Sequence, residues 1–540
     1  MNLRERINEH LGKIYQGVDL IEAKTLFAKL LIEDWQIVNR QRVNEQSTYL
    51  ITYGDSFYDG QRAPLAVLGE VLEQKLPDFT DIHLLPIFPY TSDDGFSVLD
   101  YQKIDPVLGT WADIEQLAQR RRLMFDFVCN HISKSSDWFQ RFLRAEPDFK
   151  NSFIEFDAKF DTSNVTRPRT SALFHKYGTK QVWTTFSEDQ VDNNVRDPKV
   201  LIRLTRILMG YIQRGASSIR LDAIGFLWKA SGTTSMHLPQ THEVIKLWRT
   251  MINNLAPNVQ IITETNVPHA ENLSYFGDGE DEANMVYQFP LPPLVLHTFI
   301  SGNSAKLSRW AETIHPISES ATYFNFLASH DGIGLRPVEN ILTKAEREQI
   351  VAQVRAHAGK VSYKSDLDGN DSPYELNINY SEALGSTAKM IAAHFILLSF
   401  IGVPAIYYHS IFGSKNDVQA VEETGISRRI NRERLDMHTL FAELELDGTR
   451  KMIFEGLSKL IAIRKQEPAF NPYGEQKILK LGEAVFALER SYAGEKITAI
   501  VNISDKVVEL GVTGFDLISQ SEFFGNLPAY QFVWIKSKAE

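Results

Sequence analysis

Eight short β-branched or aliphatic runs, each followed by turn residues and then by a helical pattern, place the strongest constraint on the fold. The runs are YLITY (49–53), IHLLPI (82–87), LMFDFV (123–128), SIRLD (218–222), VQIITE (259–264), NMVYQF (284–289), TYFNFL (322–327) and VPAIYY (403–408). Strands that alternate with helices in this way are typical of a parallel (β/α)8 barrel, in which functional groups gather at the C-terminal strand ends. The sequence therefore predicts an α/β fold built on such a barrel.

Two insertions and two end segments interrupt or extend the alternation. A polar, irregular stretch predicts a subdomain after strand three, and a charged helical piece with the loop KSDLDGNDSPYE predicts another after strand seven. Loops of this length in a barrel usually form functional walls. The predicted units are an N-terminal helical extension (1–45), a first barrel segment (46–132), inserted subdomain B (133–196), a second barrel segment (197–333), an inserted subdomain after strand seven (334–385), a third barrel segment (386–468) and a C-terminal antiparallel β domain (469–540).

Composition and charge limit the class of protein. The 540 residues are 43% hydrophobic and 23% charged, which is typical of a globular chain with a large core. The net charge of -11 is spread along the chain without basic runs, so we expect neither nucleic acid nor an anionic membrane as a partner. An enzyme of small substrates fits this composition, and the sequence leaves monomer or homodimer open.

The single cysteine and the apolar runs bear on location. Cys129 stands alone, which excludes intrachain disulfides and a metal site built from cysteines. The opening MNLRERINEHLGKIY mixes acidic and basic residues with apolar ones and contains no secretory signal. The longest apolar run, 391–408, holds His394, Gly402 and Pro404 and predicts a buried helix that passes into a strand. We expect a cytoplasmic protein without a membrane span.

The fourth run offers the first candidate for catalysis. Ile219 and Leu221 alternate with Arg220 and Asp222, a period of two that places the charged pair on one face of a strand. A buried Arg–Asp pair is more often structural than catalytic, so this motif is weak by itself. The predicted strand ends also carry Asp126, Asn130 and His131 after strand three, Glu264 after strand five, and His330 and Asp331 after strand seven. Their convergence on one rim of a barrel predicts an active site there.

Four motifs in this order, DFVCNH, IRLDAIGF, ITETN and FLASHD, resemble those of the α-amylase clan, glycoside hydrolase family thirteen. The resemblance covers nearly the whole chain. It implies that Asp222 is the nucleophile, Glu264 the general acid/base and Asp331 the carboxylate that supports the distorted sugar. It also implies that His131, Arg220 and His330 contact sugar hydroxyls or the nucleophile.

The physical chemistry of these residues agrees with such roles. A retaining glycosyl transfer needs one ionised carboxyl group to attack C1 and one protonated group to release the leaving oxygen. We expect Arg220 to keep Asp222 ionised by lowering its pKa. Glu264 has no obvious cation beside it in the sequence, so we expect it to keep its proton near neutral pH.

Three further segments are WKASGTTSMHLPQTHEVIKLWR, TETNVPHAENLSYFGDGEDEANMVYQFPLPPLVLHTF and LASHDGIGLRPVE. They resemble those of glucosylglycerate phosphorylases, within the sucrose phosphorylase subfamily of the clan. Asp93 and Phe96, in the loop PYTSDDGFSVLDY, match the subfamily's glucose-closing residues, and Arg432 in GISRRINRERL matches the partner of Asp93. Phe226 and Asn266 stand where sucrose phosphorylase has Tyr and His, so the phosphate and acceptor contacts must differ.

The implied reaction is retaining phosphorolysis of a small α-glucoside. The first expectation is conversion of 2-O-α-D-glucosyl-D-glycerate and phosphate to α-D-glucose 1-phosphate and D-glycerate, with phosphate as co-substrate and no cofactor. The alternatives are the same chemistry on sucrose, sucrose 6-phosphate or glucosylglycerol, an α-glucoside hydrolase, and a non-catalytic scaffold. The presence of all three acids argues against the scaffold.

Two arginines are predicted to bind anions. The subfamily resemblance implies that Arg169, in VTRPRT, binds phosphate, because a guanidinium grips phosphate oxygens in pairs. Arg336 follows strand seven and is our candidate for the glycerate carboxylate, with a loop salt bridge to Glu339 as the alternative. Each could instead be an ordinary loop arginine.

No metal is expected. Asn130 stands at the clan's usual calcium-ligand position, but the subfamily generally lacks that ion. The segment DLDGND lacks the spacing of an EF-hand and its terminal Glu, so we interpret it as a solvated turn.

Overall fold

A closed barrel of eight parallel strands forms the centre of the molecule. The computed structural model describes residues 1–37, 40–168, 171–365, 371–446 and 448–536. The barrel order is β1-β16-β12-β11-β10-β9-β4-β3, and β3 pairs back onto β1. The strands are β1 (Tyr49–Thr52), β3 (Asp81–Leu84), β4 (Arg122–Phe127), β9 (Ala216–Leu221), β10 (Gln260–Thr263), β11 (Met285–Tyr287), β12 (Thr322–Phe326) and β16 (Val403–Tyr407). Each lies on one of the eight predicted runs, so the predicted barrel is confirmed.

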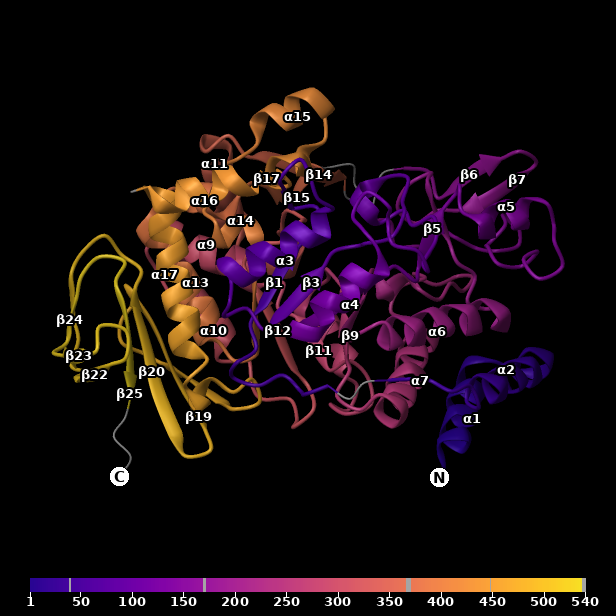
Figure 1. Cartoon of the computed structure of the whole chain (residues 1–540), viewed down its shortest axis with the longest axis horizontal. Helices are drawn as coiled ribbons and strands as arrows, with labels where there is room; N and C mark the ends of the chain where they lie inside the picture. Colours follow the sequence, from indigo (N-terminus) through magenta and orange to yellow (C-terminus); the bar gives the residue numbers. More distant parts are fainter. Residues whose placement is uncertain (38–39, 169–170, 366–370, 447, 537–540) are drawn as a thin grey trace.

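Helices surround these strands on the outside (Figure 1). The covering helices include α3 (Pro64–Gln74), α4 (Trp111–Arg120), α6 (Pro198–Gln213), α7 (Pro239–Leu255), α9 (Leu291–Ser301), α10 (Ala305–Ala311), α13 (Thr387–Ser399) and α17 (Thr449–Arg464). Proline at the first position of α3, α6 and α7 starts each helix where an amide hydrogen would lack a partner. The apolar run at 391–408 forms the end of α13 and then β16, as predicted.

The segment after strand three forms a small body beside the barrel, at the upper right of Figure 1. Its elements are β5 (His131–Ser133), α5 (Asp137–Leu143), β6 (Phe174–Tyr177), β7 (Lys180–Trp183) and β8 (Gln190–Asp192). β5 pairs with β8 and β6 with β7, both antiparallel. We call this body subdomain B.

The segment after strand seven folds over the barrel rim. It contains β13 (Ile333–Gly334), the 3-10 turn Arg336–Val338, α11 (Lys344–Ala356), β14 (Lys360–Ser365) and β15 (Asp371–Asn377). The strands form an antiparallel sheet in the order β13-β15-β14. The predicted solvated turn DLDGND falls largely on residues 366–370, which lie outside the described residues.

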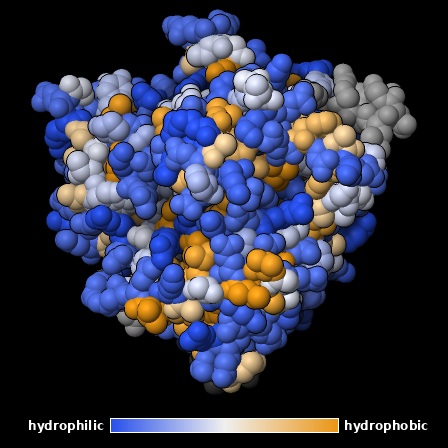
Figure 2. All heavy atoms as spheres, turned by 90° about the vertical axis from the view of Figure 1, so that its right-hand side faces the viewer, coloured by the Kyte–Doolittle hydropathy of each residue, from blue (hydrophilic) through white to orange (hydrophobic). Residues whose placement is uncertain are grey.

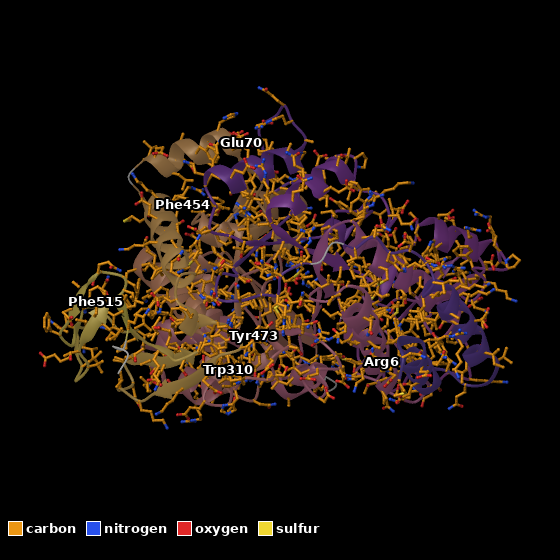
Figure 3. All side chains as sticks on the ribbon, turned by 60° about the horizontal axis from the view of Figure 1, so that its bottom comes forward. Arg6, Glu70, Trp310, Phe454, Tyr473 and Phe515 are labelled. Atoms are coloured by element: carbon orange, nitrogen blue, oxygen red, sulfur yellow. The ribbon has the colours of Figure 1, made fainter. Side chains whose placement is uncertain are left out.

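Two N-terminal helices, α1 (Leu3–Ile14) and α2 (Gly17–Leu30), pack against α7 and α6. Ile7, Leu11 and Ile14 are buried, and Arg6, labelled in Figure 3, donates to Asn254 of α7 at 2.7 Å. The extension therefore packs on the barrel helices through its apolar stripe.

The face that Figure 2 presents is mostly hydrophilic, with apolar side chains in small separate groups.

The C-terminal residues form a six-stranded antiparallel sheet in the order β18-β19-β20-β25-β22-β23, at the left of Figure 1. The strands are β18 (Glu475–Leu479), β19 (Val485–Tyr492), β20 (Glu495–Asn502), β25 (Phe532–Lys536), β22 (Gly514–Asp516) and β23 (Ser521–Phe523). Phe515 of β22 lies on the far side from the barrel in Figure 3. In the described ranges, no helix combines the length and the apolar character that crossing a membrane requires.

Candidate active site

Three barrel-strand ends bring three carboxyl groups to one cavity. Asp222 follows β9 directly, Glu264 follows β10 directly, and Asp331 lies in the loop after β12. All three line a cavity of about 140 Å³. Ala223 adopts a left-handed conformation, with φ of 47°, and its amide donates to Glu264 Oε2 at 3.0 Å. The turn after the nucleophile candidate thus also orients the acid/base candidate.

Arg220 lies beneath these carboxyl groups. It is 2% exposed, and its Nη1 pairs with Asp126 and donates to Asp222 Oδ1 at 2.9 Å. Its Nη2 is 4.0 Å from Glu264 Oε2. Asp126 also contacts His83 Nε2 at 2.8 Å, so one cation serves several acids in a buried network.

The net direction of the Asp222 pKa differs from our expectation. Burial raises the pKa of Asp222 more than the charge of Arg220 lowers it, and the charge of Glu264 raises it further. Burial likewise raises the pKa of Glu264, and the charge of Asp331 adds to the effect. The charge of Arg220 does lower the pKa of Asp222, as expected, but the net direction is upward because burial outweighs it. Because Arg220 donates directly to Asp222 and not to Glu264, it favours the proton on Glu264.

Asp331 has an arginine and a buried histidine on its other side. Arg428 Nη1 lies 2.6 Å from Asp331 Oδ1, and His330 Nε2 lies 3.5 Å from Oδ2. Burial raises the pKa of Asp331, but the charges of Arg428, His330 and Arg432 outweigh it and hold that pKa below its usual range. Asp331 is thus ionised, as a carboxylate that faces a cationic sugar must be.

The expected glucose side of the cavity unites residues from three segments. Phe96 stacks on the ring of His330 with centroids 4.9 Å apart, and its carbonyl accepts from His131 Nε2 at 2.9 Å. Asp93 accepts from Gln190 Nε2 at 3.2 Å. Asp93, Phe96, His131 and His330 all line the cavity, so the structure brings these predicted residues together.

The predicted pairing of Arg432 with Asp93 is not observed. Arg432 pairs with Asp94 and donates to the carbonyl of His330 at 2.8 Å. Asp93 and Asp94 have φ values of 53° and 47°, so the backbone turns between them and points neighbouring carboxylates in different directions. Asp93 lines the cavity, whereas Asp94 forms ion pairs with Arg429 and Arg432.

Sequence reasoning missed four residues that line the cavity. Arg428 is one of several arginines in SRRINR, and the sequence offers no means to choose among them. Glu375 and Gln190 reach the cavity from the two insertions, which carry no strand pattern that fixes direction. His83 had a signal, since it is a polar residue inside the aliphatic strand β3.

The cavity is also lined by the two residues at which the chain departs from sucrose phosphorylase, Phe226 and Asn266. The buried Oδ1 of Asn266 has no hydrogen-bond partner among the described residues. Arg336 lines the cavity as well, and no described residue forms a hydrogen bond or ion pair with its guanidinium. Arg169 lies outside the described residues, while Pro168 before it lines the cavity.

Asn130 contacts a buried amine and a carboxylate. Lys229 Nζ donates to Asn130 Oδ1 at 2.8 Å and pairs with Asp192 Oδ2 at 2.6 Å. Asn130 Nδ2 donates to the same Asp192 oxygen at 3.0 Å. The Lys229 amine thus contacts both Asn130 Oδ1 and Asp192 Oδ2. The same contacts join subdomain B to the barrel.

Comparisons with known proteins agree with this geometry. Residues 53–354 match the family model described as alpha amylase, catalytic domain. The chain is 42% identical to the glucosylglycerate phosphorylase of Escherichia coli (strain K12), over 99% of this chain and 100% of that one. It is 42% identical to the glucosylglycerate phosphorylase of Allomeiothermus silvanus, over 99% of this chain and 98% of that one. The crystal structure of sucrose 6F-phosphate phosphorylase from Thermoanaerobacter thermosaccharolyticum matches with a TM-score of 0.76 and 25% identity, over 86% and 94% of the two chains.

Proposed function

This chain belongs to the α-amylase family of catalytic domains, and from that premise we propose that it is a retaining phosphorylase of a small α-glucoside. The substrate is 2-O-α-D-glucosyl-D-glycerate, the substrate class named by relatives that match along the whole chain. Phosphate is the co-substrate, and the products are α-D-glucose 1-phosphate and D-glycerate.

The observation that carries the chemistry is the set of three carboxyl groups on one cavity with Arg220 beneath them. In the first step Asp222 attacks C1 while Glu264 protonates the departing glycerate oxygen. In the second step phosphate attacks the glucosyl-enzyme from the side that glycerate left, and Glu264 accepts its proton. Two inversions give net retention. The double displacement uses only these carboxyl groups, so no cofactor is included in the proposal.

Arg336 is proposed to bind the glycerate carboxylate. Its guanidinium lines the cavity without a partner among the described residues, so it can bind an anion without breaking an existing pair. Burial lowers the pKa of His237, and the nearby charges of His242 and Arg336 add to the effect, so the Arg336 guanidinium lies near His237. A charge-assisted hydrogen bond contributes about 1.5–3 kcal/mol, or roughly tenfold or more in preference for glycerate over glycerol.

The test is the phosphate-dependent release of glucose 1-phosphate from a panel of glucosides, together with synthesis from glucose 1-phosphate and glycerate, glycerol or fructose. Native enzyme should prefer glycerate, and Arg336→Leu should lose most of that preference while glycerol turnover is kept. Arg355→Leu, at an exposed position of α11, is the matched control. If sucrose or fructose is preferred, the glucosylglycerate assignment fails and the sucrose-type alternative replaces it.

Arg169 is proposed to bind the incoming phosphate. Support comes from the preceding Pro168, which lines the cavity, and from the fit of a guanidinium to phosphate oxygens. Arg169→Ala should raise the KM for phosphate and divert the glucosyl-enzyme to water, seen as free glucose. An unchanged phosphate dependence would contradict this role.

A further inference from the structure

Asp189 of subdomain B accepts hydrogen bonds from four hydroxyl groups, three in the segment 91–97 and one in β5. Thr91 Oγ1 and Ser92 Oγ donate to its Oδ2 at 2.5 Å each, and Ser97 Oγ donates to the same oxygen at 2.8 Å. Ser133 Oγ donates to Oδ1 at 3.1 Å. We call these four hydroxyl groups and the Asp189 carboxylate the hydroxyl clamp.

Three of the four hydroxyl groups belong to one hairpin. Thr91 N donates to the Ser97 carbonyl at 3.1 Å, and Tyr90 bridges to Val98, so the two legs of the hairpin run side by side. The clamp therefore grips both legs just below the tip. That tip carries Asp93 and Phe96, the residues on the expected glucose side of the cavity.

The tip is strained. Asp93, Asp94 and Gly95 have successive positive φ values of 53°, 47° and 106°, and two of these residues carry side chains that disfavour this region. Gly95 packs so closely on Pro86 that an added Cβ would lie 2.8 Å from Pro86 Cβ. Such a conformation persists only where contacts on both sides fix it. Arg429 and Arg432 hold Asp94 on one side, and the clamp holds the legs on the other.

The clamp works without a cation. Among the described residues no lysine or arginine forms an ion pair with the Asp189 carboxylate. Burial raises the pKa of Asp189, but the hydrogen bonds from Ser92, Thr91, Ser97 and Ser133 outweigh it, so the pKa lies below its usual range. The carboxylate is thus ionised and accepts four hydroxyl hydrogen bonds on its two oxygens, whereas a side-chain amide has a single acceptor oxygen with two lone pairs.

The next residue extends the connection to the tip itself. Gln190 Nε2 donates to Asp93 Oδ2 and to the carbonyl of Phe96, both at 3.2 Å, and lies 3.3 Å from His131 Nε2. Gln190 also lines the cavity. Any shift of the segment at Asp189 would therefore move three groups of the glucose side together.

We propose that Asp189 is a positioning residue that fixes the donor-sugar subsite by clamping the strained hairpin 91–97 to subdomain B. The proposal goes beyond the overall reaction and rests on the proposed function only in placing a glucosyl unit beside Asp93 and Phe96. It assigns subdomain B a role in donor binding, separate from the acceptor contact proposed for Arg336.

The test compares Asp189→Asn with Glu188→Gln, an adjacent substitution whose side chain is 57% exposed in the native protein. Asn keeps the size but offers one acceptor oxygen in place of two. Asp189→Asn should raise the KM for glucose 1-phosphate and for 4-nitrophenyl α-glucoside about tenfold or more, while the KM for glycerate in synthesis stays within twofold. Glu188→Gln should change none of these.

Further outcomes decide the proposal. A folded Asp189→Asn enzyme with an unchanged donor KM, or with donor and acceptor KM raised equally, overturns it. If Asp189→Asn is insoluble, Ser92→Ala/Ser97→Ala takes its place and must raise the donor KM alone. Release of nitrophenol with water as acceptor needs no phosphate. It therefore reports on the clamp even if native enzyme forms no glucose 1-phosphate, a result by which the proposed function alone would fail.

Discussion

At the scale of the residue, the site has more buried acids than cations around Asp222, the proposed nucleophile. Arg220 is shared by Asp126, Asp222 and Glu264, so its charge cannot compensate all of them. Burial raises the pKa of both Asp222 and Glu264. The two carboxyl groups therefore keep one proton between them. A pair in which one carboxyl group is protonated and the other ionised is what an acid/base and a nucleophile require.

Replacement of Asp222 by Asn should abolish the covalent step. Asn keeps the contact with Arg220 through its carbonyl oxygen but cannot attack C1, so we expect kcat to fall by about three decades or more. The measurement is kcat for phosphorolysis, with anomer analysis of the product. A variant that keeps a tenth of native activity with retained stereochemistry would remove Asp222 from this role.

Glu264→Gln should raise the unfolding temperature at neutral pH while activity falls. Below the unfolded-state pKa of Glu, about 4.3, the carboxyl group is protonated in both states and costs nothing. Because burial raises the folded-state pKa of Glu264, native stability falls as pH rises from there towards that pKa, and the full cost remains above it.

Gln cannot ionise, so its advantage should grow from pH 4 to pH 8, to about 2 °C or more. Thermal unfolding of both proteins across that range is the measurement. Glu348→Gln, with a side chain 61% exposed on α11, is the control and should show no such trend. A difference that stays constant with pH would contradict the argument.

At the scale of the element, the sheet after strand seven is fastened to the catalytic centre. Glu375 of β15 is 4% exposed and accepts from Arg428 Nε at 3.0 Å and Nη2 at 2.8 Å. The third guanidinium nitrogen of Arg428 reaches Asp331. The position of an inserted sheet is thus coupled through one side chain to the orientation of Asp331, the carboxylate that we propose to support the sugar.

Glu375→Gln should weaken this connection with little change of volume. The amide loses one charged acceptor of a paired hydrogen bond, each worth about 1.5–3 kcal/mol, so kcat/KM should fall about tenfold or more. The fall should appear with every acceptor, because Asp331 acts on the sugar. Glu348→Gln, in the same inserted segment, should leave kcat/KM within twofold of native enzyme. An unchanged kcat/KM in Glu375→Gln would show that Arg428 holds Asp331 without the sheet.

At the scale of the whole molecule, a buried arginine joins the C-terminal sheet to the barrel. Arg490 of β19 is fully buried and donates to the carbonyls of Phe400 at 2.9 Å, Asn471 at 2.7 Å and Glu475 at 3.1 Å. Trp534 of β25 donates to Ser399 Oγ at 2.8 Å in the same junction. The sheet therefore supplies hydrogen-bond donors to the polar groups at the C-terminal end of α13.

Arg490→Leu should destabilise the protein without changing its chemistry. Each buried carbonyl left without a donor costs about 1–3 kcal/mol, so we expect the unfolding temperature to fall by about 5 °C or more. The kcat measured well below that temperature should stay within twofold of native enzyme. Lys496→Leu, on the exposed side of β20, should change neither quantity. A loss of kcat in a folded Arg490→Leu enzyme would mean that the sheet acts on the site.

Much of this structure could be predicted from local sequence patterns. Short β-branched or aliphatic runs identified all eight barrel strands, because the strands of a parallel barrel are covered on both faces and are therefore largely aliphatic. The motifs at the strand ends identified Asp222, Glu264 and Asp331, which the barrel then brings to one cavity. What the patterns could not give were contacts between distant segments, such as Arg428 with Asp331 or Asp189 with the hairpin at 91–97.

The sequence by itself determined the barrel and the family of the chain, because strand patterns and short motifs depend on residue types at close spacings. Only the tertiary structure decided that Arg432 pairs with Asp94 rather than Asp93, since two successive positive φ values turn neighbouring side chains apart. It alone also decided the net pKa direction of Asp222, because the cost of burial depends on everything packed around the carboxylate and outweighs the adjacent arginine.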